Sequence, residues 1–141
     1  YDISSEVYSL APSGMLTISC SFANKELLPS MAELFATLGE LKHRGVTSQE
    51  VEKARLAMGV EHSWEAQDIE ALAEEAGDHL LWDQTYKPSR YPSAIEGIHQ
   101  DQVNTVISEL FHKKNCGIVI LGAPSKNLET KITDLASASL T

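Results

Sequence analysis

Within residues 15–22, apolar and polar side chains alternate from Leu16 onward, and this pattern constrains the fold more than any other feature of the chain. The apolar face comprises Leu16, Ile18, Cys20 and Phe22. A period of two with one polar face is typical of an antiparallel strand that is buried on one side. The preceding Ala11-Pro12-Ser13-Gly14 is a strong turn signal, and residues 1–10 show a mixed alternation. The sequence therefore predicts a β-hairpin at the start of the chain.

Apolar residues then recur at helical spacing and predict a first helix. Its start lies between Lys25 and Pro29, because Pro29 fits only in the first turn of a helix. Gly45 is a typical residue just beyond a helix end. The expected helix therefore ends at Arg44.

A capping box, Thr47-Ser48-Gln49-Glu50, predicts the start of a second helix, in which Thr47 is the cap and Glu50 reaches back to it. We expect this helix to break in the region 62–67. Further helical patterns cover residues 69–81 and 93–98, and another helix starts at His99 or Asp101 and runs to Phe111. The stretch from Tyr86 to Pro92 is typical of a loop.

The run from Cys116 to Leu121 is continuously apolar, which is consistent with a strand that is buried on both faces. Gly122-Ala123-Pro124 ends this run. Ser125 is the expected cap of a final short helix, and the Ser- and Ala-rich tail is expected to fray.

The predicted order of elements is β-β-α-α-α-α-β-α, which indicates an α+β fold. We expect a two-layer sandwich, with a mostly antiparallel sheet and the helices on one of its faces. The apolar face of the hairpin should meet the helix layer together with Leu34, Phe35, Leu38, Val119 and Leu121. Three strands leave open sheet edges, so we expect a homodimer through strand pairing or through the apolar helix stripe.

The length of 141 residues corresponds to a single domain. The chain has no initiator Met and begins inside a predicted strand. We therefore expect residues 1–141 to be one truncated domain, with residues 125–141 as its C-terminal helix and tail.

The formal net charge is −9, from 11 basic and 20 acidic residues. This balance argues against nucleic acid and anionic membranes as partners, because both favour basic patches. No apolar run approaches the roughly 18–20 residues that span a bilayer. The acidic residues between Glu65 and Asp78 are either a solvated helix face or a surface for cationic peptides.

Neither zinc-peptidase pattern, His-Glu-x-x-His or His-x-x-Glu-His, occurs in the chain, although it has five histidines. The segment Met58-Gly59-Val60-Glu61-His62 comes nearest, but a thioether stands where the first imidazole ligand should be. A site formed by His62 and His79 would need two separate helical segments to converge. We therefore predict no catalytic residues and no metal ligands in this chain.

The two cysteines, Cys20 and Cys116, are far apart in the sequence and form no Cys-x-x-Cys pair. We interpret both as small buried apolar residues. A disulfide between them requires that their strands be neighbours, and the sequence leaves this open.

Several short phrases occur in an order that resembles the C-terminal half of a domain of the pitrilysin, insulinase and mitochondrial processing peptidase type of zinc metallopeptidase. The phrases cover about residues 1–124. They are Tyr1-Asp2-Ile3-Ser4-Ser5, Gly14-Met15-Leu16-Thr17-Ile18, the stretch from Gly45 to Arg55, the stretch from Ile95 to Val103, and Leu121-Gly122. The match is better to the inactive type of domain than to the catalytic type.

This resemblance implies a zinc-less segment that helps to enclose the peptide substrate of a zinc endopeptidase. It implies zinc in the parent's catalytic domain and none in this chain, and a homologous catalytic half-domain and a peptide or protein substrate as partners. Tyr1 matches a substrate-binding tyrosine of such domains. The alternative is a non-catalytic scaffold module of the same superfamily. The compartment stays open between the bacterial periplasm and the cytoplasm.

Overall fold

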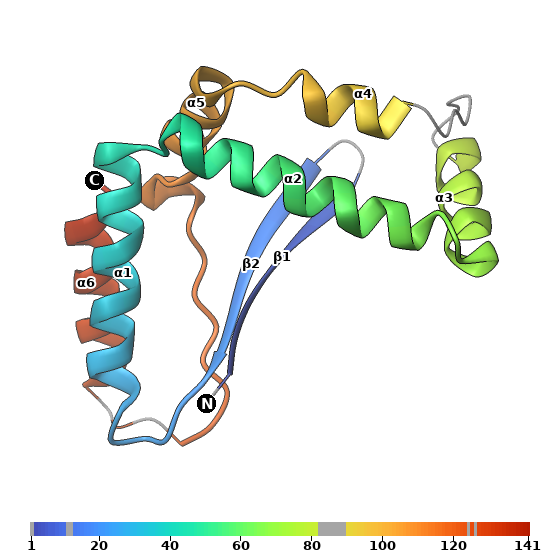
Figure 1. Ribbon diagram of the computed structural model, residues 1–141. Helices are drawn as coiled ribbons and strands as arrows, with labels where there is room; N and C mark the ends of the chain where they lie inside the picture. Colours follow the sequence, from blue (N-terminus) through green and yellow to red (C-terminus); the bar gives the residue numbers. More distant parts are fainter. Residues whose placement is uncertain (1, 11–12, 82–89, 124, 126) are drawn as a thin grey trace. The chain divides into compact units, whose positions relative to one another are not determined.

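The computed structural model describes all residues except 1, 11–12, 82–89, 124 and 126 (Figure 1). The chain divides into two compact units. The first comprises Tyr1–Gly45 and Val106–Thr141, and the second comprises Val46–Thr105. Helices dominate both units, and an antiparallel pair of strands in the first unit makes the fold α+β, as predicted.

The first unit opens with the predicted hairpin. Strand β1 (Asp2–Leu10) pairs antiparallel with β2 (Ser13–Ser21), and the register sets Ile3 opposite Cys20. Residues 11 and 12 of the expected turn lie outside the described residues. The sheet of the described residues has these two strands alone, whereas the sequence predicted a third.

Helix α1 (Leu27–Arg44) begins and ends where the sequence predicts. Its last turn carries Lys42, His43 and Arg44, and cations at this position interact favourably with the helix dipole. Gly45 follows with a φ of 69°, a left-handed conformation that suits glycine. The Gly45 N–H donates to the Leu41 carbonyl oxygen at 2.8 Å, which satisfies one of the free carbonyl groups at the helix end.

Helix α6 (Leu128–Ser139) packs along α1, and this helix pair holds the main core of the first unit (Figure 1). The buried members of the core are Met31, Phe35, Leu128, Ile132, Ala136 and Leu140. Cys20 of β2 packs against this cluster, together with Leu34 and Leu38 of α1. The apolar face of the hairpin therefore meets the helices through Cys20, as the alternation predicts. Leu16, Ile18 and Phe22 are half-buried.

The predicted strand from Cys116 to Leu121 is wrong, since within the described part of the chain this segment forms neither a helix nor a ladder with another strand. Val119 is 95% exposed and Leu121 is fully exposed, whereas Ile120 packs against the helical core. A continuous apolar run has no period, so the pattern could not indicate which residues would face the core.

The C-terminal tail does not fray, contrary to the expectation from its composition. Helix α6 continues to Ser139, and Leu140 beyond it is only 2% exposed. The Leu140 carbonyl oxygen accepts hydrogen bonds from the Lys42 ammonium at 3.2 Å and from the Lys113 backbone N–H at 3.0 Å. Burial and these two bonds hold the tail in place.

Helix α6 also begins later than expected. Its cap residue is Asn127, whose side chain makes no capping hydrogen bond, so the assignment of Ser125 as the cap is wrong. Before it, α5 (Gln100–Leu110) is followed by a short 3₁₀ turn, η1 (Lys113–Asn115). Among the described helices, none is long and apolar enough to cross a membrane.

The second unit contains α2 (Ser48–Glu65), α3 (Ile69–Leu81) and α4 (Arg90–Glu96). The predicted break after α2 is confirmed at residues 66–68, where backbone bonds of turn type replace the helical ladder. Helix α2 packs against α4, with Val51 and Ile95 as buried residues. The expected loop from Tyr86 to Pro92 is wrong at its end, because Arg90–Pro92 belong to α4, and residues 86–89 lie outside the described residues.

Candidate functional site

Tyr1, the residue that the family resemblance assigns to substrate binding, lies outside the described residues. Its role therefore stays a prediction. The strand that follows it is described from Asp2 onward and is exposed over residues 2–9, with Ile3 60% and Val7 77% exposed.

The histidines that the sequence singled out lie on two helices of the second unit. His62 belongs to α2 and His79 to α3. Met58 lies on α2 four residues before His62 and is 37% exposed. Within the described residues, no group of three or more His, Cys, Asp and Glu side chains is arranged to hold a metal ion.

Both cysteines are free thiols. Cys20 is half-buried against the helical core, which fits its interpretation as a small apolar residue. Cys116 is exposed, so the expectation that it is buried is wrong. The prediction rested on a buried strand at this position, and the described residues form no such strand.

The acidic face of α3 is exposed at Glu70, Glu74 and Asp78. Beside it, Glu74, Gly77, Asp78, Leu80 and Leu81 line a shallow, open hollow. Leu80 and Leu81 are 74% and 79% exposed, so this part of the helix presents carboxylates and apolar side chains side by side. Such a surface can hold a cationic peptide by charge and by apolar contact.

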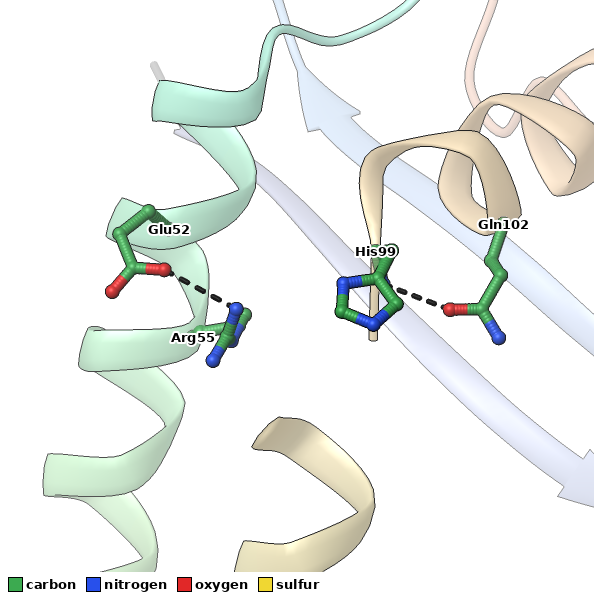
Figure 2. Close-up of polar contacts among 4 residues, drawn as sticks. All are labelled: Glu52, Arg55, His99 and Gln102. Atoms are coloured by element: carbon green, nitrogen blue, oxygen red, sulfur yellow. Dashed lines mark hydrogen bonds and ion pairs between the residues drawn. The ribbon is translucent and has the colours of Figure 1, made fainter. Parts of the chain in front are cut away.

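Arg55 on α2 is a cation that the sequence reasoning did not single out. Its Nη1 lies 3.3 Å from Glu52 Oε2, one helical turn earlier, as Figure 2 shows. The Arg55 side chain is 28% exposed, and its buried Nε has no hydrogen-bond partner among the described residues. An N–H group in this state favours an acceptor oxygen, such as a peptide carbonyl or a carboxylate. The sequence signal was a basic residue four positions after the buried Val51, on the same helix face.

The segment before α5 is fixed by local hydrogen bonds. The backbone N–H of His99 donates to Gln102 Oε1 at 2.8 Å (Figure 2). This bond satisfies a donor at the helix start, in the manner of a capping interaction.

A second set of amide contacts fastens the segment before α2 to α5. Asn104 accepts from the Val46 N–H at 2.8 Å, and Gln100 Nε2 donates to the Val46 carbonyl oxygen at 2.7 Å. The Gln100 Oε1 in turn accepts from the Ser48 hydroxyl at 2.6 Å. These bonds hold the start of α2, and with it Glu52 and Arg55, against the start of α5.

The described residues form a helix-rich α+β chain in which no group of metal ligands is arranged. Residues 1–58 match the family model described as the peptidase M16 inactive domain. The matched part covers β1, β2, α1 and the first part of α2 up to Met58. The resemblance to the inactive, C-terminal type of pitrilysin and insulinase domain is therefore confirmed over these residues.

Over residues 1–58 the chain is therefore similar to the non-catalytic type of domain in this peptidase family. Arg55 and Glu52 fall within the matched part, whereas α3 and its acidic face fall outside it. No curated protein and no solved structure matches the chain.

Proposed function

We propose that this chain is a substrate-enclosing, zinc-less segment of a zinc-dependent endopeptidase, in which it binds peptide and leaves bond cleavage to a homologous catalytic half-domain. The observation that carries this proposal is the match of residues 1–58 to the inactive domain of a peptidase family. A non-catalytic domain that accompanies a peptidase acts through what it binds. The substrate of a peptidase is a peptide, so an extended peptide is the ligand to expect.

The chemistry of the described residues supports a cationic peptide as this ligand. The chain carries a net charge of −9, and α3 exposes three carboxylates next to Leu80 and Leu81. Charge of one sign raises the local concentration of an oppositely charged ligand and is weakened by salt. The guanidinium of Arg55, whose side chain is 28% exposed, offers N–H donors for a main-chain carbonyl oxygen of the peptide.

Fluorescence anisotropy tests this proposal with two short labelled peptides of equal length, one rich in Lys and Arg and the other rich in Asp and Glu. We expect the basic peptide to bind, the acidic peptide not to bind, and added salt to weaken the binding. Tyr1→Ala and Arg55→Gln should each weaken binding by about tenfold, which corresponds to about 1.4 kcal/mol. Tyr8→Ala, a change at an exposed position of β1, is the matched control.

Equal affinity for both peptides, or no binding of either, would contradict the proposal and favour a scaffold role. A second assay concerns cleavage. We expect the chain to leave a fluorogenic peptide intact in the presence of added zinc. Turnover that a chelator and His62→Ala both abolish would contradict the non-catalytic assignment.

A further inference from the structure

The segment of residues 117–121 in the first unit has a main chain without hydrogen-bonding partners among the described residues. Cys116 before it donates its N–H to the Lys113 carbonyl oxygen at 3.2 Å, but the next five residues make no hydrogen bond to any described residue. Such a run of free N–H and C=O groups is a template for strand pairing.

The side chains of this segment have the alternation of an extended strand. Ile120 packs against the helical core, whereas Val119 and Leu121 on either side of it are 95% and 100% exposed. Ile and Val favour strands, because their branched side chains fit a pleated and half-buried surface. The segment therefore has the composition and the exposure of a strand that lacks its neighbour.

A second open edge exists in the same unit. Strand β1 is bonded to β2 on one side, and its other side carries no strand among the described residues. Ile3 and Val7 of β1 are 60% and 77% exposed. The two open edges do not pair with each other within one molecule. A second copy of the chain offers a partner for each open edge, because its own segment can pair with β1 and its own β1 can pair with the segment.

We propose that Gly117–Leu121 is a strand-pairing surface and that its occupant is the β1 edge of a second copy of this chain. The exchange is reciprocal: each copy contributes its segment to the other copy's β1, which is the self-complementary arrangement of a two-fold dimer. In this dimer the strands that carry Val119 with Leu121 and Ile3 with Val7 become neighbours in one sheet, so that these exposed apolar side chains gain cross-strand contacts.

Charge selects this occupant. Two exposed lysines, Lys113 and Lys114, precede the segment, whereas β1 carries the exposed acids Asp2 and Glu6. In a chain with a net charge of −9, a local basic pair favours the chain's own acidic strand over another basic surface. The β2 strand carries no charged residue, so it offers no such complement.

Sedimentation velocity of the full chain over a concentration series tests the dimer. We expect a monomer–dimer equilibrium that Val119→Glu with Leu121→Glu weakens at least tenfold. The matched control is Leu56→Glu with Val60→Glu, which adds the same charge at exposed positions of α2 and should leave the dimer unchanged. A strictly monomeric chain at high micromolar concentration would overturn the proposal, and so would a dimer that both double variants weaken equally.

A charge exchange tests the choice of partner strand. Lys113→Glu with Lys114→Glu should weaken the dimer, and Asp2→Lys with Glu6→Lys should do the same. The four substitutions together should restore dimerisation, because the attraction is rebuilt with opposite signs. If the variant with all four substitutions dimerises as weakly as either double variant, β1 is excluded as the occupant.

Discussion

Gly39 of α1 lies so close to Ser139 of α6 that a methyl carbon on Gly39 would stand 3.1 Å from the Ser139 carbonyl oxygen. The Ser139 Cβ would be only 3.3 Å away. This is tighter than an ordinary van der Waals contact, and it falls where the last turn of α6 packs along α1. The absence of a side chain at Gly39 is what lets the two helices approach here.

Gly39→Ala should therefore lower the free energy of unfolding by about 1 kcal/mol. The crowding of a well-packed contact costs about 1–3 kcal/mol and outweighs the helix propensity that alanine gains over glycine. Urea denaturation measures the difference. Gly59→Ala is the matched control, because a methyl carbon at that position of α2 would meet nothing within 4 Å. Gly59→Ala should stabilise the chain by about 0.5–1 kcal/mol. If Gly39→Ala also stabilises the chain, then α6 can move enough to relieve the crowding, which would contradict the prediction.

Phe35→Ala should destabilise the chain strongly, because Phe35 is 3% exposed within the α1–α6 core. Deletion of a buried phenyl ring costs about 3–5 kcal/mol through lost burial and the cavity it leaves. Denaturant melts measure the loss, with Leu56→Ala, at a position 63% exposed, as the control. A loss below about 1 kcal/mol for Phe35→Ala would show that the core is assigned wrongly.

Thr47→Ala should cost about 1 kcal/mol, since it removes one half of the capping box of α2. The Glu50 N–H donates to Thr47 Oγ1 at 3.2 Å, and the Thr47 N–H donates to Glu50 Oε2 at 2.7 Å. Asn127→Ala at the start of α6 is the control, because the Asn127 side chain makes no capping bond there. Thermal unfolding compares the two, and equal losses would contradict the capping assignment.

The phenol of Tyr8 should ionise above its ordinary pKa of 10.0. The main cause is the hydrogen bond that its hydroxyl donates to the Glu6 carboxylate, and the charge of Glu6 adds to it. Because the folded pKa is raised, the stability that this bond contributes is present below pH 10 and is lost as the pH rises through the raised pKa.

An ultraviolet titration of phenolate, taken as the difference between the wild type and Tyr8→Phe, measures this value. Glu6→Gln should lower the Tyr8 pKa towards 10.0, because the charge on the acceptor is removed. A Tyr8 pKa that is unchanged by Glu6→Gln would show that the hydrogen bond is absent in solution.

Features that depend on a few neighbouring residues were determined by the sequence alone. The capping box links residues three positions apart, and Gly45 takes a backbone conformation that suits glycine whatever packs near it. The hairpin, α1, the start of α2 and the break after it follow from such rules and from clear periodicity. Much the same part of the chain, residues 1–58, matches the inactive-domain model.

The candidate site was less accessible from the sequence. The family resemblance indicated Tyr1, which lies outside the described residues. The histidines that the sequence singled out belong, within the described residues, to no group that is arranged to hold a metal ion. Arg55 becomes notable only in the folded structure, where its Nε is buried without a hydrogen-bond partner among the described residues. Whether a hydrogen-bond donor loses its access to water depends on how segments pack, and no local sequence pattern encodes this packing.

Tertiary packing also decided the last third of the chain. A strand exists only when a neighbour accepts its hydrogen bonds, so the apolar run at 116–121 could favour a strand but could not form one alone. The tail has a composition that favours fraying, yet Ala136 and Leu140 are buried against α1. The sequence determined which local conformations these residues favour. Whether each residue became buried, exposed or paired depended on a second segment that packs or bonds against it, because burial and pairing are properties of two segments at once.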